Sequence, residues 1–312
     1  MYGLQDNKSV LDYLLSRCWT TTPTGPVAIF TLKKFHMDTI CSTCATEFPA
    51  GLPLPYLCPV CNDDRQYIPL TGQQWTSMEA LSKTHTIKIS PLTPELYALQ
   101  VAPAFAIDQR ALLLLSPGGN ILWDCIPLIN EPAIEFIRSK GGLKAIAISH
   151  PHYYSVMQRW AEAFDCPIYI HELEKPWVYN GAAVRYWRGE QKDLWAGIKL
   201  IRTGGHFPGS SILHVPALSP KGTLLCGDSL YLSRNRRHIS IMYSYPNHIP
   251  LPPHELKAVT DKVTALEFDT LYGAFAWQQL PGNARKIFLD SVKRYALTPE
   301  IPRRQLDPFR GG

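Results

Sequence analysis

The sequence contains no long hydrophobic run. No stretch reaches about 18 uninterrupted apolar residues, the length that a bilayer-spanning helix needs, so we expect no membrane partner. The N-terminus has charges scattered through it and lacks the apolar core of a secretory signal; it reads MYGLQDNKSVLDYLLSRCW. The chain also lacks internal repeats and low-complexity tracts. These absences exclude membrane-spanning and repeat architectures and favour an ordinary globular fold.

Charge is also scarce in this chain. Only 18% of the residues are charged, a fraction too low for a generally disordered protein. The net charge of +5 is mildly basic and too weak to indicate nucleic-acid binding by itself. Hydrophobic residues make up 46% of the 312 residues, enough for a sizeable core in one large domain with a small accessory module. The 27 prolines and 15 tyrosines predict many turns and aromatic walls around a pocket.

Composition and motifs divide the chain into four parts. Residues 1–36 differ from the rest, and two explanations stay open: Met37 is the true start of the protein, or the segment is a poorly packed leader. Residues 37–70 contain a cysteine knob, and residues 73–295 have the pattern of one α/β domain. Residues 296–312 have the composition of a flexible tail.

Within the large domain, short apolar strands alternate with amphipathic helices. One strand, LKAIAIS, is almost continuously apolar, as a strand buried on both faces must be. A Pro-rich loop is expected over residues 232–253. Helices are predicted over residues 71–83, 132–140, 153–164, 255–266 and 283–295.

Four cysteines form two CxxC pairs separated by 13 residues: Cys41, Cys44, Cys58 and Cys61. Two residues between cysteines let both sulfurs of a tight turn face one cation, and two such turns complete a tetrahedral zinc site. Without a secretory signal this pattern indicates metal binding before disulfides or a redox pair, and we expect a reducing, cytoplasmic location. The role is structural, because a closed set of four thiolates leaves no open coordination position.

Three further stretches place metal-ligating side chains at the ends of apolar strands. His150 and His152 follow LKAIAIS, and in an extended segment their side chains point to one side. His206 lies in GGHFPGSS after IKLIR, and Asp228 ends LLCGD. Strand ends are where α/β folds bind ligands, so three imidazoles and one carboxylate predict a site for zinc or iron.

Each stretch alone is weak evidence, but their joint order is specific. The succession of HxH, GHxPGS and GD resembles the metallo-β-lactamase superfamily, whose domain is a four-layer αββα sandwich. The resemblance covers residues 73–295 and implies that His150, His152 and His206 hold a metal. It also implies that Asp228 is the carboxylate that reaches toward the metal.

The sequence departs from that family at the second metal position. The family's first motif is HxHxDH, whereas this chain has HPHYYS, with Tyr154 in place of the aspartate and Ser155 in place of the histidine. Phe275 lies near the place of the family's last histidine. We therefore expect one active-site metal held by the three histidines, with Asp228 as a ligand or beside the ligands.

The first functional hypothesis is a mononuclear zinc hydrolase acting on a small molecule. Zinc lowers the pKa of bound water toward about 7, and the resulting hydroxide would attack an ester, thioester or lactone. Asp228 would hold the hydroxide or take its proton, and Tyr154 would stabilise the oxyanion. The alternative for Tyr153 and Tyr154 is that both rings pack against the sheet.

Two other hypotheses stay open. The persulfide dioxygenases, a branch of the same superfamily, are similar in holding one iron with two histidines and one aspartate, for which His150, His206 and Asp228 are candidates. A non-catalytic or nucleic-acid-binding module is the third class. The knob lacks a Lys/Arg cluster, and the arginines near residue 236 are more typical of a solvated loop, so a nucleic-acid partner is not expected; these arginines are Arg234, Arg236 and Arg237.

Further candidate residues lie outside these stretches. His171 ends a strand beside the presumed site, where it would ligate or support a ligand, while the histidines of the Pro-rich region are expected at the surface. The segment RRHISIMYSYPNHIPLPP is expected either to wall the pocket or simply to pack on the domain. Three further cysteines are expected to be buried structural thiols: Cys125, Cys166 and Cys226.

Overall fold

The computed structural model describes residues 20–22, 25–27, 39–51 and 53–296, and the chain divides into two compact units. The first unit, Met1–Phe35, contains an antiparallel pair of short strands, β1 (Thr20–Thr22) and β2 (Gly25–Val27). The rest of the leader proposed from the sequence lies outside the described residues. So does the proposed tail, except for Ala296, which ends the last helix. The second unit, His36–Gly312, contains the knob and the large α/β domain.

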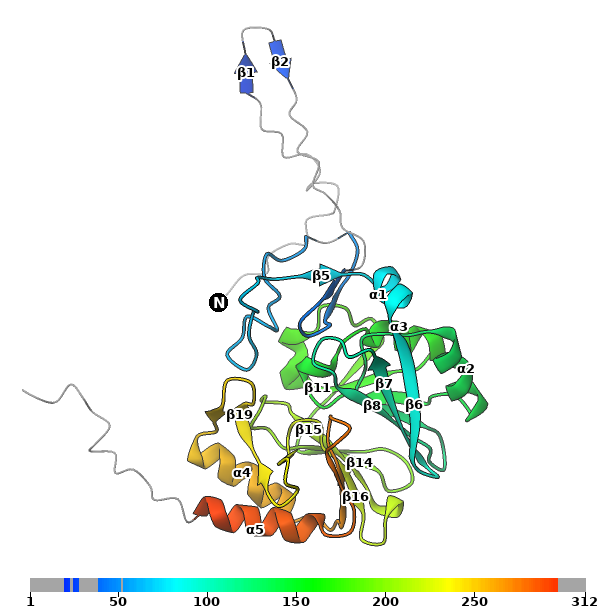
Figure 1. The fold of residues 1–312 in the computed structure, drawn as a ribbon, viewed down its shortest axis with the longest axis vertical. Helices are drawn as coiled ribbons and strands as arrows, with labels where there is room; N and C mark the ends of the chain where they lie inside the picture. Colours follow the sequence, from blue (N-terminus) through cyan, green and yellow to red (C-terminus); the bar gives the residue numbers. More distant parts are fainter. Residues whose placement is uncertain (1–19, 23–24, 28–38, 52, 297–312) are drawn as a thin grey trace, which may run out of the picture. The chain divides into compact units, whose positions relative to one another are not determined.

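Two mixed β-sheets form the centre of the second unit (Figure 1). The seven-stranded sheet has, in spatial order, β12 (Val184–Trp187), β11 (Ile168–His171), β10 (Ala145–Ala147), β9 (Ile121–Trp123), β8 (Arg110–Leu114), β7 (Leu96–Ala102) and β6 (Thr86–Thr93). The six-stranded sheet has β13 (Gln191–Asp193), β14 (Lys199–Arg202), β15 (Ser211–Val215), β16 (Thr223–Leu225), β21 (Thr270–Tyr272) and β22 (Gln279–Leu280). In the first sheet β9, β10, β11 and β12 are consecutive neighbours and run parallel to one another. In the second sheet β16 pairs in parallel with β21.

Both faces of each sheet are covered. In β14 the side chain of Leu200 belongs to the core between the two sheets, whereas Ile201 belongs to the core under the C-terminal helices. The same alternation holds for Leu225 and Leu224 in β16. Because successive side chains of a strand point to opposite faces, strands buried on both sides must be nearly continuously apolar.

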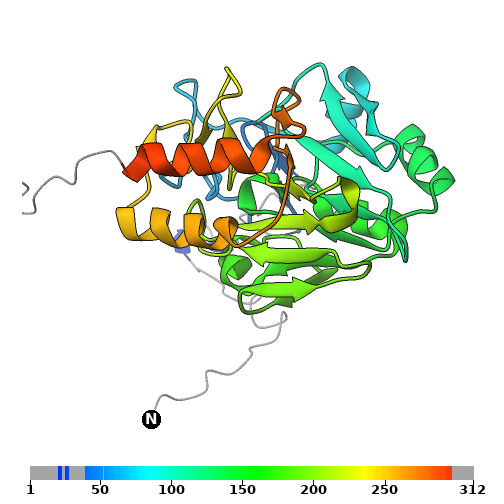
Figure 2. The same ribbon diagram turned by 90° about the horizontal axis from the view of Figure 1, so that it is seen from below.

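The helices form the two outer layers. α1 (Met78–Thr84), α2 (Glu131–Ser139) and α3 (Met157–Phe164) pack on the first sheet, and α4 (Pro253–Thr264) and α5 (Ala284–Ala296) pack on the second. Figures 1 and 2 both show α4 and α5 side by side across the outer face of the second sheet. The expected four-layer αββα sandwich is confirmed.

A buried arginine joins the two sheets. Arg110, at the start of β8, is 1% exposed, and its Nε and Nη2 donate to the carbonyl of Gly273 at 3.1 and 2.9 Å. Its Nη2 also donates to the carbonyl of Gln278 at 3.0 Å, across the turn between β21 and β22. Burial lowers the pKa of Arg110 to about 10, so the guanidinium stays charged at neutral pH.

The knob is built on a small sheet of β4 (Glu47–Phe48), β3 (Thr39–Cys41) and β5 (Trp75–Thr76). The helix expected over residues 71–83 is therefore correct only in its second half. Helix α1 begins after Ser77, whose hydroxyl accepts the N–H of Ala80 at 3.2 Å, because residues 75–76 pair with β3 instead.

The expected Pro-rich loop contains two antiparallel ribbons. β17 (Tyr231–Leu232) pairs with β18 (Ile239–Ser240), and β19 (Met242–Ser244) pairs with β20 (Ile249–Pro250). The segment expected to be a loop over residues 232–253 therefore contains paired strands. Short 3₁₀ turns complete the fold, at η2 (Pro151–Tyr153), η3 (Glu172–Trp177) and η4 (Pro216–Leu218). None of the helices in the described residues is long and apolar enough to cross a membrane.

Candidate metal centre

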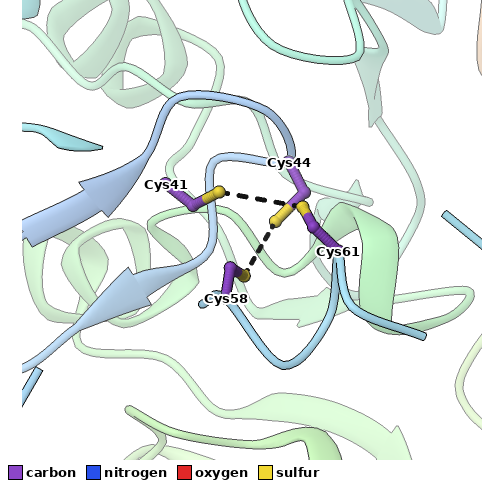
Figure 3. Close-up of side chains that lie close together, drawn as sticks. All are labelled: Cys41, Cys44, Cys58 and Cys61. Carbon is purple, nitrogen blue, oxygen red and sulfur yellow. Dashed lines mark hydrogen bonds between the residues drawn. The ribbon is translucent and has the colours of Figure 1, made fainter. Parts of the chain in front are cut away.

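The four cysteines of the knob meet at one point, as Figure 3 shows. The Sγ atoms of Cys41 and Cys61 lie 3.7 Å apart, and those of Cys44 and Cys58 lie 3.6 Å apart. Four thiolates at about 2.3 Å from a tetrahedral cation would be about 3.8 Å apart, whereas a disulfide would bring two sulfurs to about 2.0 Å. All four thiols are free and buried, so this cluster fits a closed tetrahedral metal site and not a pair of disulfides.

Polar neighbours fit thiolates rather than thiols in this cluster. The Nε2 of Gln73 donates to Cys41 Sγ at 3.2 Å, and the Oε1 of the same side chain accepts the N–H of Cys58 at 2.9 Å. The hydroxyl of Thr46 lies 3.2 Å from Cys44 Sγ. Hydrogen-bond donors to the sulfurs stabilise the charged form that binds a cation.

The second group of potential ligands lies where the two sheets meet. His150 and His152 follow β10 of the first sheet, while His206 follows β14 and Asp228 follows β16 of the second. One ligand atom from each residue lies within 4.8 Å of the others, and all four residues are buried. His152 Nδ1 lies 3.2 Å from His206 Nε2, close to the separation of about 3.4 Å for two tetrahedral ligands at 2.0–2.1 Å.

Hydrogen bonds leave the converging nitrogens free to bind. The Nδ1–H of His206 donates to the carbonyl of Tyr243 at 2.7 Å, so its Nε2 carries the lone pair. His150 Nδ1 lies 2.8 Å from the hydroxyl of Ser149, and its buried Nε2 has no hydrogen-bond partner among the described residues. That nitrogen faces Asp228 Oδ2 at 3.5 Å. A buried nitrogen left without a partner beside a carboxylate is explained by a bound cation, so the residues fit a metal.

The electrostatics of the site match this assignment. Burial, followed by the neighbouring His150, lowers the pKa of His206 to about 3, and burial holds the pKa of His152 well below its usual range. Both imidazoles are therefore neutral, as ligands must be. Burial opposes ionisation of Asp228, but the nearby imidazoles of His150 and His206 and the hydroxyl of Tyr153 outweigh it and lower the pKa of the carboxyl group.

The tyrosine at the site is not the one expected. The hydroxyl of Tyr153 donates to Asp228 Oδ1 at 2.7 Å, whereas Tyr154 packs in the hydrophobic core with no hydrogen-bond partner for its hydroxyl among the described residues. The cause is the 3₁₀ turn η2, which replaces the extended segment that we assumed and turns Tyr153 toward the carboxylate. Ser155 also points elsewhere, because its hydroxyl accepts Gln109 Nε2 at 3.0 Å.

Supporting residues that the sequence did not reveal hold the first histidine in place. The Oδ1 of Asp124, at the end of β9, accepts the N–H of Ser149 at 2.7 Å, and the carbonyl of Ser149 accepts the N–H of Ser211 from the other sheet at 2.9 Å. Gly227 has φ +51°, and a Cβ there would overlap the side chain of Ser149, which explains the glycine before Asp228. A carboxylate directly after the buried strand ILW was the available signal for Asp124.

Other candidates take ordinary structural positions. The Nε2 of His171 lies 3.0 Å from the carbonyl of Gly189, and His171 is not part of the converging group. Three histidines expected at the surface are exposed: His238, His248 and His254. The three additional thiols are buried as expected: Cys125, Cys166 and Cys226. Phe275 is half-buried and contacts Tyr231 edge-on, with ring centroids 6.1 Å apart.

Comparisons with known proteins agree with the fold. No protein-family model matches the sequence. The chain is 40% identical over 268 residues to "Uncharacterized protein YmaE" of Bacillus subtilis (strain 168). The aligned region covers 84% of this chain and 97% of that protein. The crystal structure of the DIM-1 metallo-β-lactamase has a TM-score of 0.51 and 13% identity, covering 68% of this chain and 98% of its own. A B3 metallo-β-lactamase with an active-site glutamic acid has a TM-score of 0.49 and 16% identity, covering 71% of this chain and 94% of its own.

Proposed function

Because the chain belongs to the family of the Bacillus subtilis protein YmaE and has the metallo-β-lactamase fold, we propose that it is a metal-dependent hydrolase with one active-site cation. Its substrates in this proposal are small esters, thioesters or lactones. The observation that carries the proposal is the convergence of three imidazoles and one carboxylate in a buried site where the two sheets meet.

The described residues offer one set of active-site ligands. Two groups of metal-ligating side chains converge in the part of the chain that the structure describes, and the knob accounts for one of them. Tyr154, Ser155 and Phe275 stand where the metallo-β-lactamase motif has further ligands, and none of the three carries an imidazole, thiolate or carboxylate. This supports a mononuclear centre.

The chain's own residues supply orientation and proton transfer. A cation at this position supplies Lewis acidity toward a carbonyl oxygen and lowers the pKa of a coordinated water. Asp228 is placed to accept the proton of the attacking water, and the Tyr153 hydroxyl holds the carboxylate in one orientation. Burial raises the pKa of Tyr153 well above its usual value, so this hydroxyl stays protonated and keeps donating to Asp228.

A row of half-buried aromatic rings runs outward from the site. The ring of Tyr245 lies 5.5 Å from that of His206, stacks on Tyr231 at 4.5 Å, and through Tyr231 reaches Trp277 at 5.6 Å. The guanidinium carbon of Arg234 lies 4.2 Å from the Trp277 ring centroid. Uncharged aromatic rings beside the site suit an apolar acyl or alcohol group, so we propose that the substrates carry one.

Metal stoichiometry and a hydrolysis panel test the proposal together. Wild type is expected to hold two metal ions per chain, whereas His152→Ala and Cys58→Ser are each expected to hold one. Nitrophenyl esters, aryl thioesters and aliphatic lactones then serve as substrates, and His152→Ala is expected to lose the activity of wild type. A wild-type protein that binds metal only in the knob contradicts the proposal.

The same metal analysis separates the proposal from the iron oxygenase. An oxygenase of the two-histidine, one-carboxylate type would contain one iron beside one knob zinc after isolation without added metal, and it would consume oxygen. The ligand nitrogens of all three histidines lie within 4.8 Å of one another, which favours the three-histidine hydrolase. Two zinc ions with no hydrolysis of any substrate in the panel would instead favour the non-catalytic module.

A further inference from the structure

The loop that follows the second CxxC pair reaches the residues around His206. The guanidinium carbon of Arg65 lies 4.3 Å from the ring centroid of Phe207 and 4.5 Å from that of Tyr243. Phe207 directly follows His206, and the carbonyl of Tyr243 accepts the Nδ1–H of that histidine. The guanidinium therefore sits between the two residues that fix the position and tautomer of one active-site imidazole.

Hydrogen bonds hold this loop against the ribbon that carries Tyr243. The hydroxyl of Ser244 donates to the carbonyl of Arg65 at 3.1 Å. The Nδ2 of Asn247 donates to the carbonyls of Asp64 and Gln66, both at 2.9 Å. The side chain of Arg65 is only 13% exposed, so its contact with the rings is a packed one.

Asp63 fixes the arginine from the knob side. Both oxygens of this carboxylate accept Nη1 of Arg65, at 2.8 and 3.0 Å, and Oδ1 also accepts the N–H of Arg65 at 3.0 Å. Asp63 follows Cys61 by two residues, and the N–H of Asn62 donates to the carbonyl of Cys58 at 2.9 Å. The position of Arg65 thus depends on the turn that holds the second pair of cysteines.

The knob also contacts the other histidine segment. The N–H of Glu47 donates to the carbonyl of Ser155 at 3.3 Å, three residues after His152. The buried Oε1 of Glu47 accepts the Nε of Arg159 at 2.6 Å. The knob therefore contacts residues that follow His152 as well as residues that follow His206.

We propose that Arg65 is a positioning residue through which the four-cysteine knob fixes His206, so that an ordered knob raises the metal affinity of the histidine site. The strands of the knob are two or three residues long, and a sheet of this size depends on its bound cation for order. Residues that orient a ligating histidine contribute about 10–100-fold to metal affinity. This inference rests on the proposed metal-dependent function.

Cobalt(II) distinguishes the two sites in the intact protein. Thiolate-to-cobalt charge transfer reports the knob, and the ligand-field bands of a nitrogen and oxygen site report the histidines. Titration against a chelator then gives an affinity for each site. The variants are Arg65→Met and Asn247→Ala, with Arg65→Lys as the conservative change and Arg188→Met as a control at an arginine that is 83% exposed and paired with Glu172.

The histidine site is expected to bind cobalt about 10–100-fold more weakly in Arg65→Met, with an altered ligand-field spectrum. Asn247→Ala is expected to shift affinity in the same direction. Arg65→Lys keeps a cation between the rings and is expected to stay within about threefold of wild type, as is Arg188→Met. The thiolate band is expected to be unchanged in every variant.

Three results would overturn the inference. The histidine site of Arg65→Met could bind cobalt as tightly as that of wild type, or Arg65→Lys could lose as much cobalt affinity as Arg65→Met. The third is a loss of affinity at the histidine site that occurs only when the thiolate band of the knob is lost as well. The last would mean that the arginine serves general folding rather than the histidine site. A wild-type protein without any nitrogen and oxygen cobalt site would refute the proposed function itself, and this inference with it.

Discussion

Replacing Glu174 by glutamine should stabilise the protein at alkaline pH. This side chain is 1% exposed; the N–H of Gly209 donates to its Oε1, and its Oε2 has no hydrogen-bond partner among the described residues. Burial raises the pKa of Glu174 to about 7, although the Gly209 N–H and the charge of Arg65 act in the opposite direction. The folded protein thus disfavours the carboxylate relative to the unfolded chain.

The sign and size of the effect follow from the two pKa values. Below the unfolded value near 4.5 the group is protonated in both states, and its contribution to stability is fully present. That contribution is lost as the pH rises through the folded value of about 7. Each pKa unit between the unfolded and the folded value corresponds to 1.36 kcal/mol, so the whole loss is about 3 kcal/mol. Glutamine stays neutral and keeps an oxygen to accept the Gly209 N–H.

Urea denaturation at pH 5 and pH 8, with metal held saturating, measures this difference. Glu174→Gln is expected to match wild type within about 1 kcal/mol at pH 5 and to exceed it by about 3 kcal/mol at pH 8. Glu190→Gln serves as the control of opposite sign, because ion pairs with Arg202 and Lys262 lower the pKa of Glu190. A difference between Glu174→Gln and wild type that does not change with pH would refute the reasoning.

Two further substitutions probe the site. Tyr153→Phe removes the hydrogen bond to Asp228 and should weaken metal binding at the histidine site by about 10–100-fold in chelator competition, while Tyr154→Phe should leave it unchanged; equal effects would contradict the assignment. Gly209→Ala places a methyl group against the carboxylate of Glu174 and should lower the unfolding free energy by about 1–3 kcal/mol, a loss that the added change Glu174→Ala should largely relieve.

Much of the fold was predictable because its strands are buried on both faces. LKAIAIS could not be an exposed strand, and the glycines after residue 140 ended the preceding helix where expected. The ligands were predictable for a related reason. Each ligand directly follows a strand of this kind. Because the strand is fixed within a buried sheet, the residue after its end has a defined position.

What the sequence did not reveal depends on contacts between distant segments. Whether Tyr153 or Tyr154 faces the carboxylate is decided by a single 3₁₀ turn, which spacing alone does not distinguish from an extended segment. The link from Arg65 to Tyr243 joins residues that are far apart in the sequence, and no local pattern encodes it. Short ribbons such as β19–β20 are likewise fixed by their packing partners rather than by propensity.

Arg110 also bears on the order in which the chain can assemble during synthesis. Its carbonyl acceptor at Gly273 lies 163 residues further along, so the ribosome releases β8 long before that acceptor exists. Until then the guanidinium has water as its partner, and the apolar surface around it is interrupted by a hydrated cation. The contact between the two sheets at this arginine can therefore form only after the chain has been synthesised as far as Gln278.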